Sequence, residues 1–159
     1  MYEKIYLRHS NVSRRNKNHN HNKTKETVAF SEKDFLPTTK EEMQRRGWDQ
    51  CDVILISGDA YIDSPFIGVA MVGRMLERMG YKVGIIGQPD VKSETDIKRL
   101  GEPRLYWGVS GGSVDSMVSN YTATKKFRNS DDYTPGGVNN KRPDRAVLVY
   151  TNLIRRHFK

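Results

Sequence analysis

Two aspartates lie four residues apart, just after the first long apolar run of the sequence. Asp59 and Asp63 flank the segment Ala60–Ile62, between a predicted strand and a predicted helix. Two carboxylates on one loop can bind Mg²⁺ or a ribose, or act as acid and base where their pKa values differ. They can equally cap the helix or face another domain. Both are therefore candidate catalytic residues, and the choice between these roles stays open.

Other polar residues stand where the predicted strands end. In an open parallel sheet, ligands bind beyond the carboxyl ends of the strands, where loops and helix N-termini converge. The Gly111–Ser113 turn could seat a phosphate or carboxylate on free backbone N–H groups, or be a tight turn only. Neither G-x-G-x-x-G nor a P-loop pattern is present, so the sequence has no nucleotide fingerprint. The predicted ligand-binding residues of this rim are Ser57, Gly58, Gln88, Asp90, Gly111, Gly112, Ser113 and Asn152.

Strand and helix patterns alternate along the chain and would position this rim. Val53–Ile56 is a continuous apolar run, typical of a strand buried on both faces. Thr39 and Glu42 have capping-box spacing, which predicts a short helix over 40–46 that Gly47 ends. Further strands are predicted over 81–86, 104–109 and 146–150, and further helices over 64–79, 93–100 and 113–120. The alternation predicts an α/β fold with a Rossmann-like or flavodoxin-like parallel sheet of about four or five strands and flanking helices.

One long connection interrupts the alternation. Residues 122–145 lack periodicity, which indicates a functional loop or a surface that packs elsewhere. The basic and aromatic stretch within it is predicted to be a domain interface, made of Lys125, Lys126, Phe127 and Arg128. Residues 153–159 read as an amphipathic helix without a stop signal. The domain at 34–159 is therefore expected to be incomplete at its C-terminus.

The sulfur-containing residues favour structural roles. Cys51 is the only cysteine, which excludes an intramolecular disulfide and favours a reducing compartment. It precedes an apolar run and has no histidine beside it, so it is interpreted as a buried structural thiol. Met71, Met75 and Met79 follow one another at helical spacing and are interpreted as core residues.

The N-terminal tail, residues 1–33, carries most of the excess charge. Residues 1–30 hold seven Lys or Arg and two Asp or Glu, a net +5 of the +8 of the whole chain. The tail is interpreted as a disordered arm, with contact to RNA or another anionic surface as the alternative. His19 and His21 lack a third ligand nearby, so no metal site is predicted. Nothing resembles a signal peptide or a membrane span, which predicts a cytoplasmic protein with no membrane partner.

Many short motifs follow one another along residues 35–152. They are Gly47–Asp52, Gly58–Asp63, Gly84–Asp90, Met117, Tyr121–Ala123, Asp131–Gly137, Lys141–Ala146 and Tyr150–Thr151. In this order they resemble the N-terminal region of the YgiQ family of radical SAM proteins. Such a series is far more specific than any single glycine pattern.

The resemblance implies a larger enzyme in which this region precedes a radical SAM barrel that binds a 4Fe-4S cluster and S-adenosylmethionine. The cluster ligands of such enzymes lie in a C-x3-C-x2-C motif, which this chain lacks, and iron–sulfur clusters need several thiolates. The chain is therefore expected to be an accessory domain, inactive alone. Its expected partner is the barrel, in the same full-length protein or in an adjacent gene product. The alternative is a stand-alone basic module that binds RNA or an anionic small molecule.

The sequence also departs from related patterns in the motifs for cobalamin and in its first loop. Its layout is similar to the cobalamin-binding domains that precede other radical SAM barrels, but no D-x-H-x-x-G motif is present and no histidine lies between residues 22 and 156. Cobalamin ligated by such a histidine is therefore not expected. The family commonly has a histidine after the aspartate of the first loop, where this chain has Ser64. A chain cut before the barrel is expected to expose apolar surface, which favours self-association.

Overall fold

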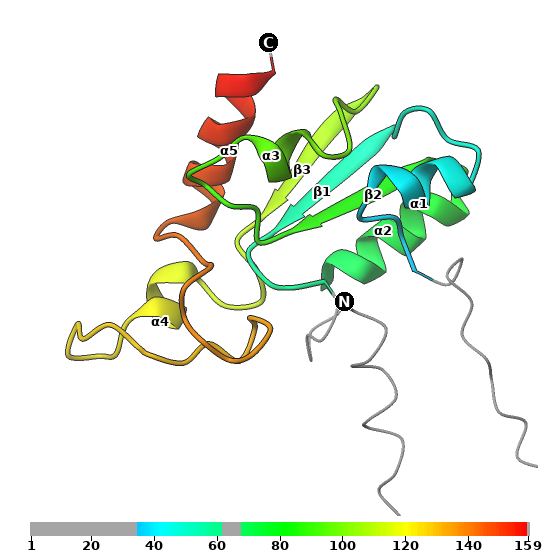
Figure 1. Cartoon of the computed structure of the whole chain (residues 1–159). Helices are drawn as coiled ribbons and strands as arrows, with labels where there is room; N and C mark the ends of the chain where they lie inside the picture. The colour runs from blue at the N-terminus through cyan, green and yellow to red at the C-terminus, as the bar shows by residue number, and fades with distance from the viewer. Residues whose placement is uncertain (1–34, 62–67, 159) are drawn as a thin grey trace, which may run out of the picture. The chain divides into compact units, whose positions relative to one another are not determined.

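A three-stranded parallel sheet forms the centre of the fold. The structure is a computed structural model that describes residues 35–61 and 68–158. The strands are β1 (Val53–Ser57), β2 (Val83–Gly87) and β3 (Tyr106–Ser110), in the order β2-β1-β3. Both pairings are parallel, and the first residues of the three strands lie opposite one another. Figure 1 shows β1 between the other two strands. The predicted α/β class with a Rossmann-like parallel sheet is confirmed, with fewer strands than expected.

The central strand is buried on both faces, as its continuous apolar sequence predicts. All five residues of β1 are buried. Ile54 and Ile56 belong to a core cluster that also contains residues of helices α1 (Lys40–Arg45), α3 (Thr95–Lys98) and α5 (Ala146–His157). Val53 and Leu55 belong to a second cluster, against which α2 (Gly68–Arg78) packs. Helices therefore cover both faces of the sheet (Figure 1).

The first helix begins and ends as its sequence signals predict. The hydroxyl of Thr39 accepts a hydrogen bond from the N–H of Glu42, and the carboxylate of Glu42 accepts one from the N–H of Thr39, 3.2 Å away. This is the predicted capping box. Gly47 follows the helix with a φ of +72°, a left-handed conformation that favours glycine.

The predicted start of the helix after β3 is wrong. α4 spans only Ser116–Asn120, and its N-cap is Asp115 and not Ser113. The side chain of Asp115 accepts a hydrogen bond from the N–H of Met117, 2.9 Å away. Asp115 and Ser113 are both good N-cap residues, so local sequence could not choose between them.

The predicted fourth strand is a helix. Residues 146–150 form the first part of α5, which continues to His157. The apolar run reads as a strand over five residues, but the buried positions extend beyond it at helical spacing. Those positions are Ala146, Tyr150, Leu153 and Ile154. The period over twelve residues, and not the composition of the first five, indicates the correct structure.

The methionine stripe of α2 is exposed, which corrects its interpretation as core. The exposed fractions of Met71, Met75 and Met79 are 54%, 60% and 70%. The side of α2 that faces the sheet instead carries Gly73, where a Cβ would collide with the side chain of Leu36. The predicted start of this helix near residue 64 lies outside the described residues. Within the described ranges, no helix has the length and hydropathy needed to cross a membrane.

The two edges of the sheet differ. On the outer side of β2, the carbonyl of Pro37 accepts a hydrogen bond from the N–H of Ile85, 2.9 Å away. The segment that precedes α1 therefore covers this edge. On the outer side of β3, no strand formed by residues 35–61 or 68–158 is paired.

Asp52 joins the starts of all three strands. It precedes β1, and its Oδ2 accepts a hydrogen bond from the backbone N–H of Lys82, 2.9 Å away and just before β2. Its Oδ1 accepts one from the Nε of Arg104, 2.8 Å away and close to the start of β3. The hydrogen bond from Lys82 is the main cause that holds the pKa of Asp52 below its ordinary value, and Arg104 lowers it further. The charged carboxylate therefore stabilises the folded state.

We expect Asp52→Asn to lower the free energy of unfolding by about 1–3 kcal/mol at neutral pH, the usual effect of losing a charged hydrogen-bond partner. Because folding lowers the pKa of Asp52, its contribution is complete above the unfolded-state pKa of about 3.9. It is lost as the pH falls through the lower folded-state pKa. Urea denaturation at neutral and acidic pH measures both effects. Asp49→Asn, at an exposed carboxylate, is the control, and equal losses in the two variants would contradict the prediction.

Candidate functional site

A buried arginine joins three segments at the carboxyl end of the sheet. The Nη2 of Arg142 lies 2.7 Å from Oδ1 of Asp59, which follows β1, and 3.4 Å from Oδ2 of Asp131 in the long loop. Its Nη1 donates to the carbonyl of Gly111, 3.0 Å away and just after β3. The guanidinium also lies 5.2 Å from the ring centroid of Tyr133, a cation–π distance. The Arg142 side chain is fully buried, so its charge is balanced inside the protein.

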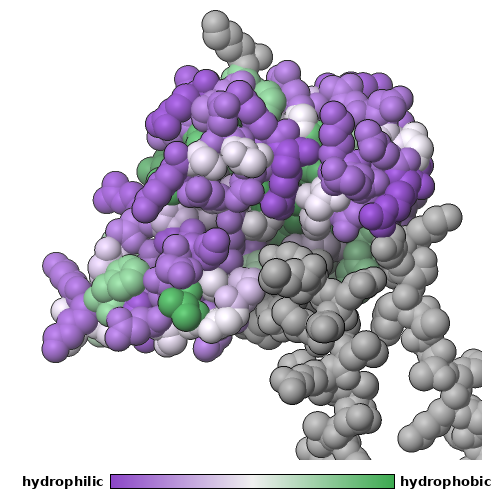
Figure 2. All heavy atoms as spheres, in the orientation of Figure 1, coloured by the Kyte–Doolittle hydropathy of each residue, from purple (hydrophilic) through white to green (hydrophobic). Residues whose placement is uncertain are grey.

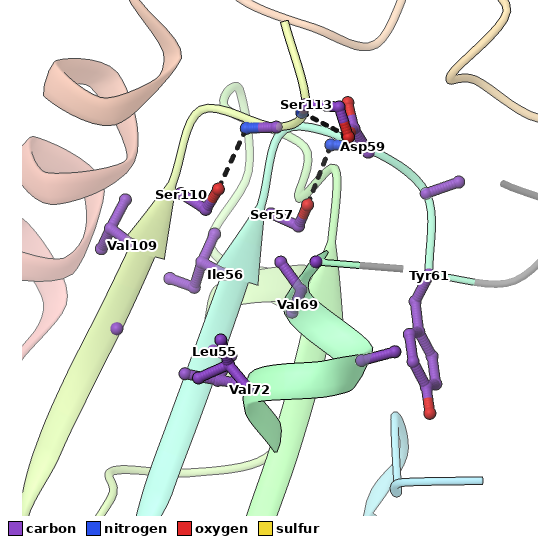
Figure 3. A pocket seen from close by; sticks show the side chains of 15 residues that line it. Leu55, Ile56, Ser57, Asp59, Tyr61, Val69, Val72, Val109, Ser110 and Ser113 are labelled. Atoms are coloured by element: carbon purple, nitrogen blue, oxygen red, sulfur yellow. Dashed lines mark hydrogen bonds between the residues drawn. The ribbon is translucent and has the colours of Figure 1, made fainter. Parts of the chain in front are cut away.

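Asp59 is held by the turns on both sides of it. Its Oδ2 accepts a hydrogen bond from the N–H of Ser113, 2.6 Å away, and its own N–H donates to the Oγ of Ser57, 3.0 Å away (Figure 3). Gly112 has a φ of +102°, and a Cβ there would collide with the Asp59 carboxylate. Glycine is therefore required for this close approach. The carboxylate occupies the place that the Gly111–Ser113 turn offers to an external anion.

Gln88 fastens the long loop to the strand ends. Its Nε2 donates to the carbonyl of Gly58, 3.0 Å away, and to the hydroxyl of Thr134, 2.6 Å away. The Thr134 hydroxyl in turn donates to Oδ2 of Asp131 at 2.7 Å. Gln88 itself has a φ of +44°, so the backbone adopts a left-handed conformation to aim this side chain. The loop is thus ordered by side-chain hydrogen bonds, without the periodic pattern of a helix or strand.

Asp144 fixes the loop between α4 and α5. Its Oδ1 accepts a hydrogen bond from Nδ2 of Asn120, and its Oδ2 accepts one from the hydroxyl of Tyr121, both at 2.8 Å. The hydrogen bond to Asp144 raises the pKa of Tyr121. The N–H of Ala146, at the start of α5, donates to the Oγ of Ser116 at 3.0 Å. The C-terminal end of the loop is therefore bonded back to α4, from which the loop starts.

A cavity of about 370 Å³ opens beside the Arg142 network, between β1, β3 and α2. Its wall is mainly apolar, and Figure 3 shows hydroxyl and carboxylate groups gathered where β1 and β3 end. The lining includes the apolar side chains of Leu55, Val69 and Val72 and the polar side chains of Ser57, Ser110 and Asp59. The chain leaves β1 toward β2 on one side, while β3 lies on the other, so the cavity is at a topological switch point, where open α/β sheets bind ligands. It can hold an apolar group with a hydrogen-bonding end.

The structure brings most of the predicted rim together. Seven of the predicted residues lie at the ends of the strands: Ser57, Gly58, Asp59, Gln88, Gly111, Gly112 and Ser113. Ligand binding by them stays a prediction, because their bonds here are internal. Asp90 is exposed, and its Oδ1 accepts a hydrogen bond from the N–H of Lys92 at 2.9 Å. Asn152 lies within α5, which corrects its placement at the end of a strand. Asp63 lies outside the described residues.

The residues that close the site are not among those predicted from the sequence. Asp131, Thr134 and Arg142 are buried and come from the long loop. The signal that could have found them is that the loop contains charged residues and several motifs but no helix or strand period. Such a segment is held in place by side-chain hydrogen bonds to distant parts of the chain. The predicted interface residues Lys125 to Arg128 are exposed in the same loop, as a separate stretch.

Cys51 is the one cysteine of the chain, and it is inaccessible. Burial, followed by the nearby Asp52, raises the pKa of its thiol to about 11. The Sγ lies 3.7 Å from Sδ of Met43 in the core. The predicted buried thiol is confirmed. In the described ranges, no group of three His, Cys, Asp or Glu side chains is placed to hold a metal ion.

The fold and the rim define a Rossmann-like α/β domain with a cavity at the carboxyl end of its sheet. Residues 35–159 match the family described as Radical SAM N-terminal. A UPF0313 protein of Fusobacterium nucleatum is 67% identical over 125 residues, which cover 79% of this chain and 22% of that protein. A UPF0313 protein of Thermotoga maritima is 63% identical over 124 residues, which cover 78% of this chain and 22% of that protein. No solved structure matches the chain.

The chain therefore belongs to the UPF0313, or YgiQ, family of radical SAM proteins, and it corresponds to their N-terminal domain. It spans about a fifth of the length of the curated relatives it matches. The resemblance carried by the short motifs is thus confirmed.

We expect Arg142→Met to lower the free energy of unfolding by about 3–5 kcal/mol, because it leaves two carboxylates buried without their cation. The loop at 121–145 should also lose protection in amide hydrogen exchange before the sheet does. Lys141→Met, which removes an exposed cation at the next position, is the control. A loss equal to that of the control would show that Arg142 does not hold the loop.

The thiol of Cys51 should resist alkylation in the folded protein. With a pKa of about 11 and no exposure, it has little thiolate at pH 8 and no path to the reagent. Iodoacetamide labelling followed by mass spectrometry should show little reaction until urea unfolds the chain. Rapid labelling without denaturant would contradict the structure.

Proposed function

We propose that this chain is an accessory domain of a radical SAM enzyme, which contacts the catalytic part of the protein and does not carry out the chemistry alone. The family implies a 4Fe-4S cluster and S-adenosylmethionine for the full-length protein. The accessory domain would shape the substrate side of the catalytic barrel. Its main support is that the polar groups at the strand ends form hydrogen bonds with one another, while the loop that they hold exposes apolar and basic side chains.

The residues of this chain do not fit an iron–sulfur cluster. Such clusters are held by several cysteine thiolates. Cys51 is single, fully buried and beside Met43, and its raised pKa disfavours the thiolate that a metal needs. The cluster therefore belongs to another part of the family proteins, and no step of the reaction is assigned to this chain.

The Arg142 network supports a role in positioning. It holds the long loop by bonds to the ends of β1 and β3, so that the outer part of the loop projects from a fixed base. That outer part carries Phe127, which is 52% exposed and makes an edge contact with Tyr121, at 5.6 Å between centroids. Exposed cations flank the ring at Lys125, Lys126 and Arg128. Exposed aromatic rings and arginine are enriched at protein interfaces, which favours a contact role for Phe127 and Arg128.

The surface pattern agrees with this assignment. The face in Figure 2 is mostly hydrophilic, with small hydrophobic patches over α4 and the long loop. The exposed apolar residues of this region are Met117, Val118, Phe127 and Val138. These side chains give α4 and the long loop an exposed apolar surface, which supports their assignment as a contact surface.

Binding of an anion at the Gly111–Ser113 turn has less support. The N–H of Ser113 already donates to Asp59, and an external phosphate or carboxylate would meet the negative charge of Asp59 there. The alternative function, a basic module for RNA or an anionic small molecule, would take most of its positive charge from the tail at 1–33, which lies outside the described residues.

We expect this chain to co-purify with the remaining part of the Fusobacterium nucleatum relative when the two are co-expressed, and iron–sulfur absorbance to follow the complex. Lys126→Ala with Phe127→Ala should weaken recovery of the complex about tenfold, as is usual at interface aromatic residues. The matched control is Arg78→Ala with Tyr81→Ala, an exposed cation and a partly exposed ring at the opposite end of the sheet. Unchanged recovery with the first pair, or no complex at all, would overturn the proposal.

A further inference from the structure

We propose that the open edge of β3 is the docking site for a fourth parallel strand, supplied by the segment that follows α5 in the longer family proteins. The inference extends the proposed function, because the strand would come from the remaining part of the same proteins. The relatives have room for it, since this chain covers only 22% of the Fusobacterium nucleatum protein.

The edge of β3 lacks the protection that native sheet edges usually have. Proteins commonly cover such edges or place lysine, proline or inward-pointing charges on them, because free backbone groups pair with other strands. The edge of β2 is covered at Ile85, whose N–H donates to Pro37. β3 has the sequence Tyr-Trp-Gly-Val-Ser, without charge or proline, and no described strand pairs with its outer side.

The backbone groups that face outward can be assigned. The carbonyl of Ser110 accepts a hydrogen bond from the N–H of Gly58, 3.0 Å away, so Ser110 faces the β1 side. In a parallel ladder, alternate residues direct their N–H and C=O groups to opposite sides of the strand. Trp107 and Val109 therefore present their N–H and C=O groups to the open edge, where a partner strand would bond them.

The topology sends the next strand to this edge. The crossover from β2 to β3 carries α3 on the face of Ile54 and Ile56, opposite to α2. Crossovers of parallel strands are right-handed, so a crossover on the α3 face moves from β2 toward β3. α5 packs on this same face. A strand that follows α5 with the usual hand is placed beyond β3, beside its open edge.

The position of the end of α5 fits a parallel strand. The ring of Phe158, the residue after α5, lies 5.0 Å from the ring of Trp107 between centroids. Trp107 is the second residue of β3, so the chain leaves α5 beside the start of that strand. A strand beginning here would run in the direction of β3. Figure 1 shows α5 ending at the same end of the sheet at which the strands begin.

Apolar side chains flank the open edge at both ends. Leu105 and Tyr106 are 50% and 48% exposed at the start of β3. Val147 and Leu148 are 45% and 59% exposed at the start of α5, and Val147 is close to Gly111 at the end of β3. A fourth strand with apolar side chains would bury them. A second copy related by twofold symmetry would instead pair its β3 antiparallel to this one. The hand of the crossover and the end of α5 beside the start of β3 favour the parallel strand.

The test uses a synthetic peptide of about 15 residues, enough for one strand and its flanks, taken from just after the matched segment of the Fusobacterium nucleatum relative. Added to the full chain, it should slow amide hydrogen exchange at Trp107 and Val109 by about tenfold, as new strand pairing requires. The N–H of Ile85, already bonded to Pro37, should not change. Two control peptides carry N-methyl groups at alternate positions, so that only one of them loses the bonds to β3.

The proposal is supported if one methylated peptide binds like the parent and the other binds at least about tenfold more weakly. It is overturned if neither Trp107 nor Val109 gains protection, if both methylated peptides bind equally, or if β3 is protected in a dimer without peptide. The proposed function fails separately. If the peptide binds but the Phe127 variant co-purifies normally, the fourth strand is supported and the accessory interface is rejected. If the Phe127 variant loses co-purification but the peptide does not bind, only the fourth strand is rejected.

Discussion

The structure depends on the buried charge of Arg142. A guanidinium without access to water is costly unless carboxylates and carbonyls surround it, and here Asp59, Asp131 and Gly111 do so. These partners come from the end of β1, the middle of the long loop and the end of β3. Together with Gln88 and Asp144, this side chain orders a connection without helix or strand over the strand ends. The cavity beside β1 and β3 owes part of its rim to the same carboxylate.

The two ends of the sheet are joined by the same kind of interaction. Asp52 binds the segments that begin β2 and β3, and Asp59 binds those that follow β3 and form the long loop. Between these carboxylates, β1 is buried on both faces and its first four residues are apolar, so those four can hold the neighbouring strands only through the backbone. Because the charged side chains lie just outside the ends of β1, the core between them stays apolar while the strand ends are held in place. Both carboxylate oxygens of Asp59 are engaged in this way, Oδ1 by Arg142 and Oδ2 by the N–H of Ser113.

The sequence predicted the parts of the fold that arise locally. The three strands, the capping box of α1 and the buried Cys51 follow from periodicity and short-range spacing, and the structure has each of them. It did not predict the partners of Arg142, because contacts separated by 83 residues, as between Arg142 and Asp59, leave no periodic signal. The strand predicted over 146–150 is wrong because five apolar residues fit the period of a strand as well as that of a helix. The methionine stripe with Met75 was wrongly assigned to the core because apolar spacing does not say which face of a helix meets the sheet.

In the part of the chain that the structure describes, the polar groups at the strand ends have hydrogen-bond partners inside the domain, and unpaired backbone and apolar groups lie on its surface. This distribution favours a domain that acts by contacting another part of the protein. The polar groups at the carboxyl end are largely paired with one another, and the sole thiol is buried. What faces outward instead is an unpaired strand edge, an exposed methionine stripe on α2 and the ring of Phe127. Free backbone groups and apolar side chains are costly in water and gain from association. In proteins about five times as long, the remaining chain is the natural source of the surfaces that cover them.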